Sequence, residues 1–370
     1  MNPAKRNLLL FIFHIILGKL STINLEYYWR KNKRKVLKKM KLTSGEITNL
    51  WNMYMNDSGV ICHLEYELNK VEDIEIKGLI QYALDISKSH INTITKILNS
   101  ENYPIPHGFK LDEDVDVTAP RLFTDTYSLF STNNLGKMGL NAYSAALPFA
   151  VREDIYTFFS ECLRESDDIL KKTNDLLLSK GLYMKLPLLP TPENFDFVEK
   201  KSFLAGYFRE KRPLTGAEIT NLYANFQRNA LGSATMIGYS QVAKKSDVIE
   251  YILKGKEIAQ KHCEIFGSYL SESDIPSPTT LDTEVTDSTS YTFSDRKMMF
   301  YSTSLTAISV GYYGTSMSMS PRRDIGVMYS RLIGEILKYA NEGAKIMIKY
   351  GWLEEPPRAL DRDQLAKKKK

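Results

Sequence analysis

The chain has 370 residues, of which 43% are hydrophobic, so it is long enough for two or three domains with a sizeable core. The net charge of +5 is unevenly placed: the first 41 residues hold eleven bases and one acid, the last four residues are all lysine, and 42–366 is left at −9. An acidic body argues against a nucleic-acid-binding fold, whose affinity depends on clustered lysine and arginine. The three cysteines have no zinc-site spacing, which predicts reduced, buried thiols.

Residues 1–40 form an extension that begins with a short apolar run. NLLLFIFHIILG follows Lys5 and Arg6 and is too short to span a bilayer as a straight helix. The next segment, YYWRKNKRKVLKKMK, combines aromatic and basic residues, which is typical of a membrane-surface anchor. Three interpretations stay open: translation that starts at Met40, membrane contact through residues 5–41, and a signal peptide, although no small-x-small cleavage site follows.

The rest of the chain is a tandem duplication. LTSGEITNLW (42–51) matches LTGAEITNLY (214–223) at an offset of 172, and the same offset continues without a gap to Pro106 and Pro278. Beyond a loop the offset becomes 170, so that SKGLYMKLP in the first repeat aligns with KYGWLEEPP in the second. Two ungapped blocks in the same order indicate two copies of one structural unit.

Each repeat has helical periodicity and no sustained alternation with period two, which argues against strands. The first repeat reads as four helices: one after Thr43, one that carries His90, one rich in small residues, and one that ends at Gly181. The connection of about 103–120 between the second and third helices is long, which is a ferritin-like feature, whereas the other turns are short. We therefore predict an all-α protein made of two tandem ferritin-like up-down four-helix bundles.

The predicted domain boundaries follow the repeats. The first bundle covers 41–186, the second covers 213–358, and 359–370 is a basic tail. The proline-containing linker 187–212 includes FDFVEKKSFLAGYF, which has too many aromatic residues for a free linker. We expect this linker to pack on one of the bundles.

Seven motifs occur in a characteristic order: LTSGEITNLW, YALDISKSHI, AGYFREKRPLTGAEIT, EVTDST, GYYGT, RRDIGVMYSRL and YGWLEEPP. Together they resemble the domain of unknown function 3231 family of endospore-forming Firmicutes. The resemblance covers about 40–366 and both repeats, while residues 1–39 lie outside it. It implies a ferritin-like fold, a loose relation to spore coat protein F and a spore setting, but it implies no reaction.

A ferritin-like di-metal site takes one glutamate from each of two helices and a Glu-x-x-His motif from each of the other two. Neither second helix has that glutamate and neither fourth helix has that histidine: the segments read Ser87-x-x-His90, Ala259-x-x-His262, Glu165-x-x-Asp168 and Glu335-x-x-Lys338. The third helices offer no inward glutamate. The sequence therefore predicts no di-iron centre and no catalytic residue.

A reduced site is still expected in each repeat. If the second and fourth helices run parallel, His90 lies level with Glu165 and Asp57, and His262 lies level with Glu335. Three interpretations stay open for these residues: a buried hydrogen-bonded network without a cofactor, a site for one metal ion or small ligand per bundle, and proton chemistry. If a metal binds, its ligands are His90, Glu165 and Asp57 in the first repeat and His262 and Glu335 in the second.

Other polar residues have simpler predicted roles. We expect His63 and His107 to be exposed, and Glu65 to lie at the edge of an apolar stripe where it reaches water. The third helices are rich in glycine, alanine, serine and methionine, which favours close packing within a bundle or an interface with a partner.

These observations predict a non-enzymatic structural or interaction protein that is associated with sporulation or the spore. The alternative is a ferritin-like metal-binding or redox protein with the reduced His/Glu/Asp site. We expect a protein partner or a homo-oligomer, no nucleic acid, and a cytoplasmic or spore-associated location. Membrane association is expected only if the N-terminal extension is part of the protein.

Overall fold

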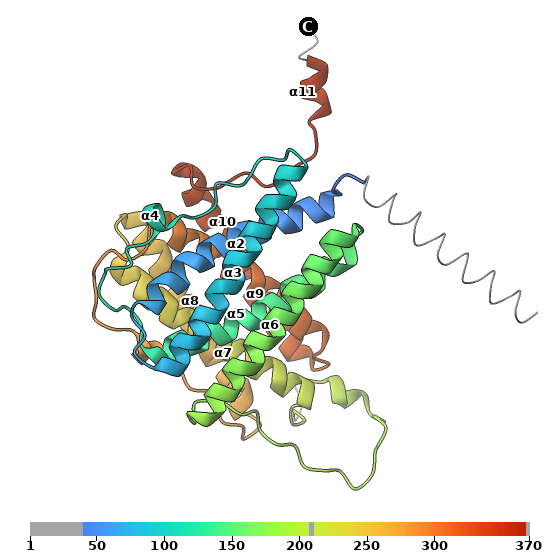
Figure 1. The fold of residues 1–370 in the computed structure, drawn as a ribbon. Helices are drawn as coiled ribbons and strands as arrows, with labels where there is room; N and C mark the ends of the chain where they lie inside the picture. Colours follow the sequence, from blue (N-terminus) through green and yellow to red (C-terminus); the bar gives the residue numbers. More distant parts are fainter. Residues whose placement is uncertain (1–39, 207–210, 368–370) are drawn as a thin grey trace, which may run out of the picture.

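The computed structural model describes residues 40–206 and 211–367, and all regular secondary structure in these ranges is helical (Figure 1). The first repeat forms α2 (Ser44–Leu68), α3 (Ile74–Ser100), α5 (Asp125–Ala146) and α6 (Glu153–Ser179). The second repeat forms α7 (Gly216–Val242), α8 (Ser246–Ser271), α9 (Asp295–Ser318) and α10 (Arg323–Lys349). Short turns of helix complete the list: α4 (Leu111–Asp114), η1 (Leu147–Phe149), η2 (Lys201–Leu204), η3 (Asp282–Glu284) and α11 (Arg362–Lys367). The prediction of an all-α protein with two tandem bundles is confirmed.

A buried glutamate fixes the start of each bundle. Thr43 caps α2, and its backbone N–H donates to Glu46 Oε2 at 2.8 Å, so the two residues form a capping box. Glu46 is fully buried, and its second oxygen accepts from the backbone N–H of Arg152 at 2.8 Å, at the start of α6. Glu218 has the same role in the second repeat. The first and fourth helices of each bundle therefore start at the same end.

The second and fourth helices run antiparallel, so the expectation that they run parallel is wrong. Lys180 at the end of α6 is 2.6 Å from Asp73 at the start of α3, and Arg152 at the start of α6 bonds Glu101 at the end of α3. The reason is the long crossover between α3 and α5, which travels the length of the bundle and reverses the second pair of helices. His90 and Glu165 still meet, because each lies near the middle of its helix.

The two crossover segments pair with each other in a reciprocal way. Val115 forms an isolated antiparallel bridge with Phe293, and Phe123 forms one with Val285. The two bridges are equivalent, because the repeat offset of 170 relates Val115 to Val285 and Phe123 to Phe293. The interface therefore has an approximate twofold axis between the bundles.

Hydrogen bonds beside these bridges repeat the same symmetry. The backbone N–H of Thr124 donates to the carbonyl of Glu284 at 3.0 Å, and that of Ser294 donates to the carbonyl of Asp114 at 3.0 Å. The Thr124 hydroxyl also donates to the Glu284 carboxylate, and the Ser294 hydroxyl donates to the Asp114 carboxylate. Because these contacts satisfy backbone groups that the crossover would otherwise bury unpaired, they hold the two bundles together.

Apolar packing joins the bundles as well. Each bundle has its own core, but one further cluster contains buried residues of both repeats, among them Tyr66 and Tyr127 from the first and Tyr239, Phe293 and Met298 from the second. A shared core of this kind packs the two bundles closely against each other.

The described parts of the interbundle linker differ in how far they are exposed. Phe195 and Phe197 are 89% and 86% exposed, because the proline-rich chain leaves the body there as a long loop (Figure 1). Phe203 does pack, with the Arg212 guanidinium 4.1 Å from its ring centre, and Gly206 is buried against Asp324.

The N-terminal predictions lie outside the described residues, since 1–39 are not among them. Within 40–206 and 211–367, no helix combines the length and the apolar composition needed to cross a bilayer.

Candidate functional site

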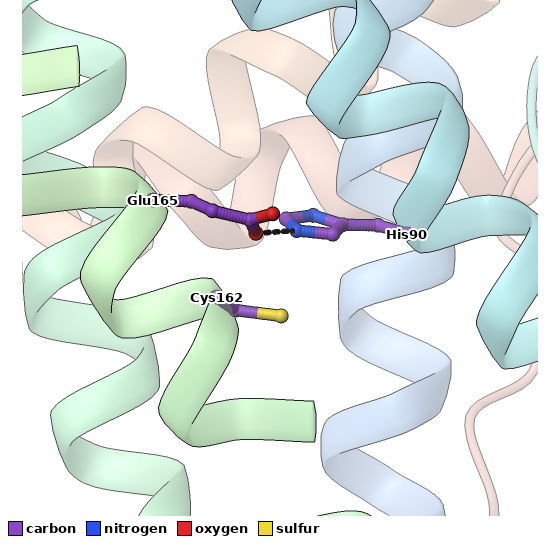
Figure 2. Close-up of side chains that lie close together, drawn as sticks. All are labelled: His90, Cys162 and Glu165. Carbon is purple, nitrogen blue, oxygen red and sulfur yellow. Dashed lines mark hydrogen bonds and ion pairs between the residues drawn. The ribbon is translucent and has the colours of Figure 1, made fainter. Parts of the chain in front are cut away.

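A polar cluster lies at the centre of the first bundle, around His90 of α3. Its Nε2 is 2.7 Å from Glu165 Oε2 of α6, and its Nδ1 is 3.1 Å from Asp57 Oδ2 of α2. Figure 2 shows Glu165 and Cys162 of α6 directed at the imidazole from the same side. The ring is 5% exposed, so three helices bring these polar groups together inside an apolar core.

His90 is held in its charged form. Burial alone would lower the pKa of the imidazolium, but hydrogen bonds with Asp57, Cys162 and Glu165 more than offset this effect and raise its pKa well above the ordinary value. Both ring N–H groups then donate to carboxylates. Burial raises the pKa of the Cys162 thiol, which is therefore neutral at pH 7.

The second bundle has a different centre. His262 Nε2 is 3.2 Å from Glu335 Oε2, but its Nδ1 is 2.9 Å from the hydroxyl of Tyr313 rather than from an acid. Asn229 donates to the same hydroxyl at 2.8 Å, and Lys261 donates to Glu335 at 2.7 Å. Every polar group of this centre is thus satisfied by the protein itself.

Burial lowers the pKa of His262, and the hydrogen bond with Glu335 only partly opposes this effect. The ring is therefore neutral at pH 7. With Nε2–H donating to Glu335, Nδ1 is left to accept from the Tyr313 hydroxyl. The duplicated histidines thus differ in charge although they occupy equivalent positions.

The pairs expected from the sequence are present: His90 with Glu165, and His262 with Glu335. Asp57 also reaches His90 as expected. Cys162 was missed. It lies three residues before Glu165, a spacing that places both on one helix face, so the signal was available in the sequence.

The donor atoms fit a metal ion in the first bundle only. Ligand atoms of His90, Cys162 and Glu165 all lie within 4.8 Å of one another, and such a mixed nitrogen, sulfur and oxygen set is suited to a divalent transition metal such as zinc. In the second bundle Leu332 stands where Cys162 would be, and the Lys261 amine already binds Glu335. The second set of predicted ligands therefore does not fit a cation.

A second polar cluster lies between the bundles, and the burial of its histidine differs from the prediction. His63 was expected to be exposed, but it is 5% exposed, with its ring stacked 6.1 Å from that of Tyr301 of the second repeat. Its Nε2 is 3.2 Å from Glu67 Oε1, an ion-pair distance without good hydrogen-bond geometry. Lys297 of α9 is buried beside them, with Nζ 3.9 Å from the centre of the Phe293 ring.

The remaining predicted polar residues lie where they were expected. Glu65 is partly exposed and pairs with Lys88 at 2.6 Å, and His107 is exposed and bonds Glu113 at 3.1 Å. In the third helix of the first repeat, α5, Gly136 lies against the backbone of α6 near Leu170, which is the close packing that small residues permit.

The fold and its duplicated centre define a protein of two tandem helical bundles. The family model described as "protein of unknown function (DUF3231)" matches residues 31–195 and again 202–365, and the chain belongs to this family. The family resemblance seen in the motifs is confirmed, but the match begins at residue 31, so the expectation that all of 1–39 lies outside the family is wrong. Among solved structures, a chain from Bacillus halodurans described as a "putative spore coat protein" is 22% identical, with 42% of this chain and 99% of that chain covered and a TM-score of 0.37. A comparison with curated proteins gives no match.

Proposed function

We propose that this protein is a non-enzymatic structural or interaction protein associated with sporulation or the spore. The motifs that it shares with a family of endospore-forming bacteria support the setting. The exposed part of the linker carries the proposal for the role: Leu188, Phe195 and Phe197 are 97%, 89% and 86% exposed. Large apolar side chains gathered on one exposed segment are typical of a protein–protein contact.

The test compares two variants of equal chemistry. Leu188→Ser/Phe195→Ser/Phe197→Ser changes the linker, whereas Ile74→Ser/Ile348→Ser changes two apolar side chains that are 83% and 64% exposed on the bundles. Each tagged chain is recovered from sporulating cells after crosslinking, and spore fractions are probed for it. We expect the linker variant to lose a partner that the wild type and the bundle variant retain. Identical crosslinked species in all three would contradict a binding role for the linker.

The donor set around His90 favours a second candidate function, binding of one metal ion in the first bundle. The ion would replace the proton on His90 Nε2 and would require the Cys162 thiolate, so its binding would release protons. The second bundle supplies a matched control. Elemental analysis of purified protein would give about one zinc per chain, lost in His90→Ala and retained in His262→Ala. A metal content that both substitutions leave unchanged would exclude this site.

A further inference from the structure

A cavity of about 450 Å³ lies between α2 and α5 of the first bundle and α9 of the second. Much of its wall is apolar, with Met53, Leu135, Phe300 and Leu305 among the lining residues. On α9 the wall continues from Lys297 to Ile308, which is eleven steps along the helix, or about 16.5 Å at 1.5 Å per residue. A cavity of this size and composition is typical of a site for a small apolar molecule.

The equivalent region of the second repeat shows that the fold does not require this cavity. The equivalents of Asn56 and Ala142 are Arg228 and Tyr312, and the Arg228 guanidinium lies 3.7 Å from the centre of the Tyr312 ring. Two small voids are found beside this stack: Arg228 lines both, of about 80 and 190 Å³, and Tyr312 lines the smaller one. The second repeat thus fills with its own side chains the volume that the first repeat leaves open.

Lys297 gives the open cavity a chemical character. It lines the cavity, is 1% exposed, and its Nζ has no hydrogen-bond partner among the described residues. The equivalent residue of the first repeat is Tyr127, whose hydroxyl bonds Thr235 at 2.8 Å. Burial lowers the pKa of Lys297 to about 8, and electrostatic interactions with Cys62, Asp114 and Glu67 only partly oppose this effect. A buried amine with three unused donor positions is a binding partner for an acid.

We propose that this cavity binds a single-chain amphiphile with an anionic head, of the class of a long-chain carboxylate. The chain lies along the apolar wall between α2, α5 and α9, and the carboxylate accepts hydrogen bonds from Lys297 Nζ. The head is anionic because the unpaired buried group is a donor that carries positive charge. This binding activity goes beyond the proposed structural role and does not depend on the linker or on the His90 cluster.

Titration calorimetry with three probes of equal chain length tests the head group. Dodecanoate, dodecanol and dodecyltrimethylammonium are titrated below their micelle concentrations into the full chain. We expect dodecanoate to bind once per chain and at least about tenfold more tightly than dodecanol, because a charged hydrogen bond is lost with the alcohol. The cationic probe should bind more weakly still. Absence of dodecanoate binding, or equal affinity for all three, would overturn the proposal.

Two variants test the location. Lys297→Met keeps the length of the side chain, so it should lower the affinity for dodecanoate to that for dodecanol and leave the alcohol unchanged. Asn56→Arg/Ala142→Tyr copies the Arg228–Tyr312 stack into the first repeat and should abolish binding of both probes. The mirror variant Arg228→Asn/Tyr312→Ala leaves the first cavity intact and should retain binding. Undiminished binding in the filled variant would place the ligand elsewhere, and this comparison holds even if Lys297→Met does not fold.

Discussion

Replacing His90 by alanine is expected to destabilise the protein more than replacing His262, although the two residues are equivalent and both are buried. His90→Ala removes the two hydrogen bonds that the imidazolium makes with Asp57 and Glu165, but the two carboxylates are affected differently. Glu165 has 35% of its side chain exposed and can turn to water, whereas Asp57 has only 9% exposed and is left as a buried acid without its cation. The loss of this charged hydrogen bond and the stranded group predict a cost of about 3 kcal/mol.

His262→Ala leaves no partner stranded. Glu335 keeps Lys261, and the Tyr313 hydroxyl keeps Asn229. The cost is then two hydrogen bonds of a neutral ring, one buried and one partly buried, or about 1–1.5 kcal/mol. The cavity left by the imidazole adds a similar amount in both variants and cancels in the comparison. The difference between the variants, about 1.5–2 kcal/mol, is the quantity to measure.

Urea unfolding monitored by circular dichroism measures this difference in stability. It is expected as a shift of the unfolding midpoint, with the dependence of the unfolding free energy on urea concentration unchanged. The double variant Asp57→Asn/His90→Ala is the control, because it removes the stranded acid and copies the asparagine of the second repeat. It should recover part of the lost stability. Equal losses in the two single variants, or no recovery in the double variant, would refute the assignment of a charged His90 beside a neutral His262.

Three further predictions test other parts of the chain. Burial alone would raise the pKa of Glu46, but backbone hydrogen bonds, that from Arg152 foremost, outweigh burial and lower it. Its contribution is present above pH 4.5 and is lost as pH falls through the lowered pKa. Glu46→Gln should therefore cost about 1–3 kcal/mol in urea unfolding at neutral pH and much less at about pH 3. Phe195→Ser/Phe197→Ser should change the free energy of unfolding by less than about 0.5 kcal/mol, since both rings are exposed, and a larger loss in the same assay would show that the linker packs. A chain that starts at Met40 should melt at nearly the same temperature as the full chain in calorimetry; a fall of more than a few degrees would show that residues 1–39 contribute to the fold.

The sequence predicted the bundles because their signals are local. Capping residues, proline stops and the repeated motifs define where helices begin and end, and the duplication confirms each element twice. The direction of α6 relative to α3 was predicted wrongly, because periodicity shows which face of a helix is buried and not which way its neighbour runs. The length of the crossover, which was recognised, is the feature that determines the direction.

The candidate sites divide in the same way. The His90–Glu165 pair could be predicted because both residues lie on the inner faces of helices within one bundle. His63 and Lys297 could not, because they are buried only by contact between the bundles. Helix α2 buries Leu50 in its own bundle and His63 against the second repeat, so its two buried faces obscure the single apolar stripe on which sequence prediction depends.

The reciprocal pairing of the crossover segments has a consequence for how the two repeats can differ. Contacts that map onto each other by a twofold operation are those of an isologous dimer, in which every substitution occurs in both subunits at once. Joining the two copies by a linker holds them at an effective concentration on the order of millimolar, so their association no longer depends on the amount of protein. It also lets one copy change alone. Two equivalent positions show such one-sided changes: Asp57 corresponds to Asn229, and Asn56 corresponds to Arg228. A symmetric dimer would instead have either two charged centres or none, and either two open cavities or none. Covalent fusion is thus what allows one half of this molecule to serve as packing while the other half keeps room for a ligand.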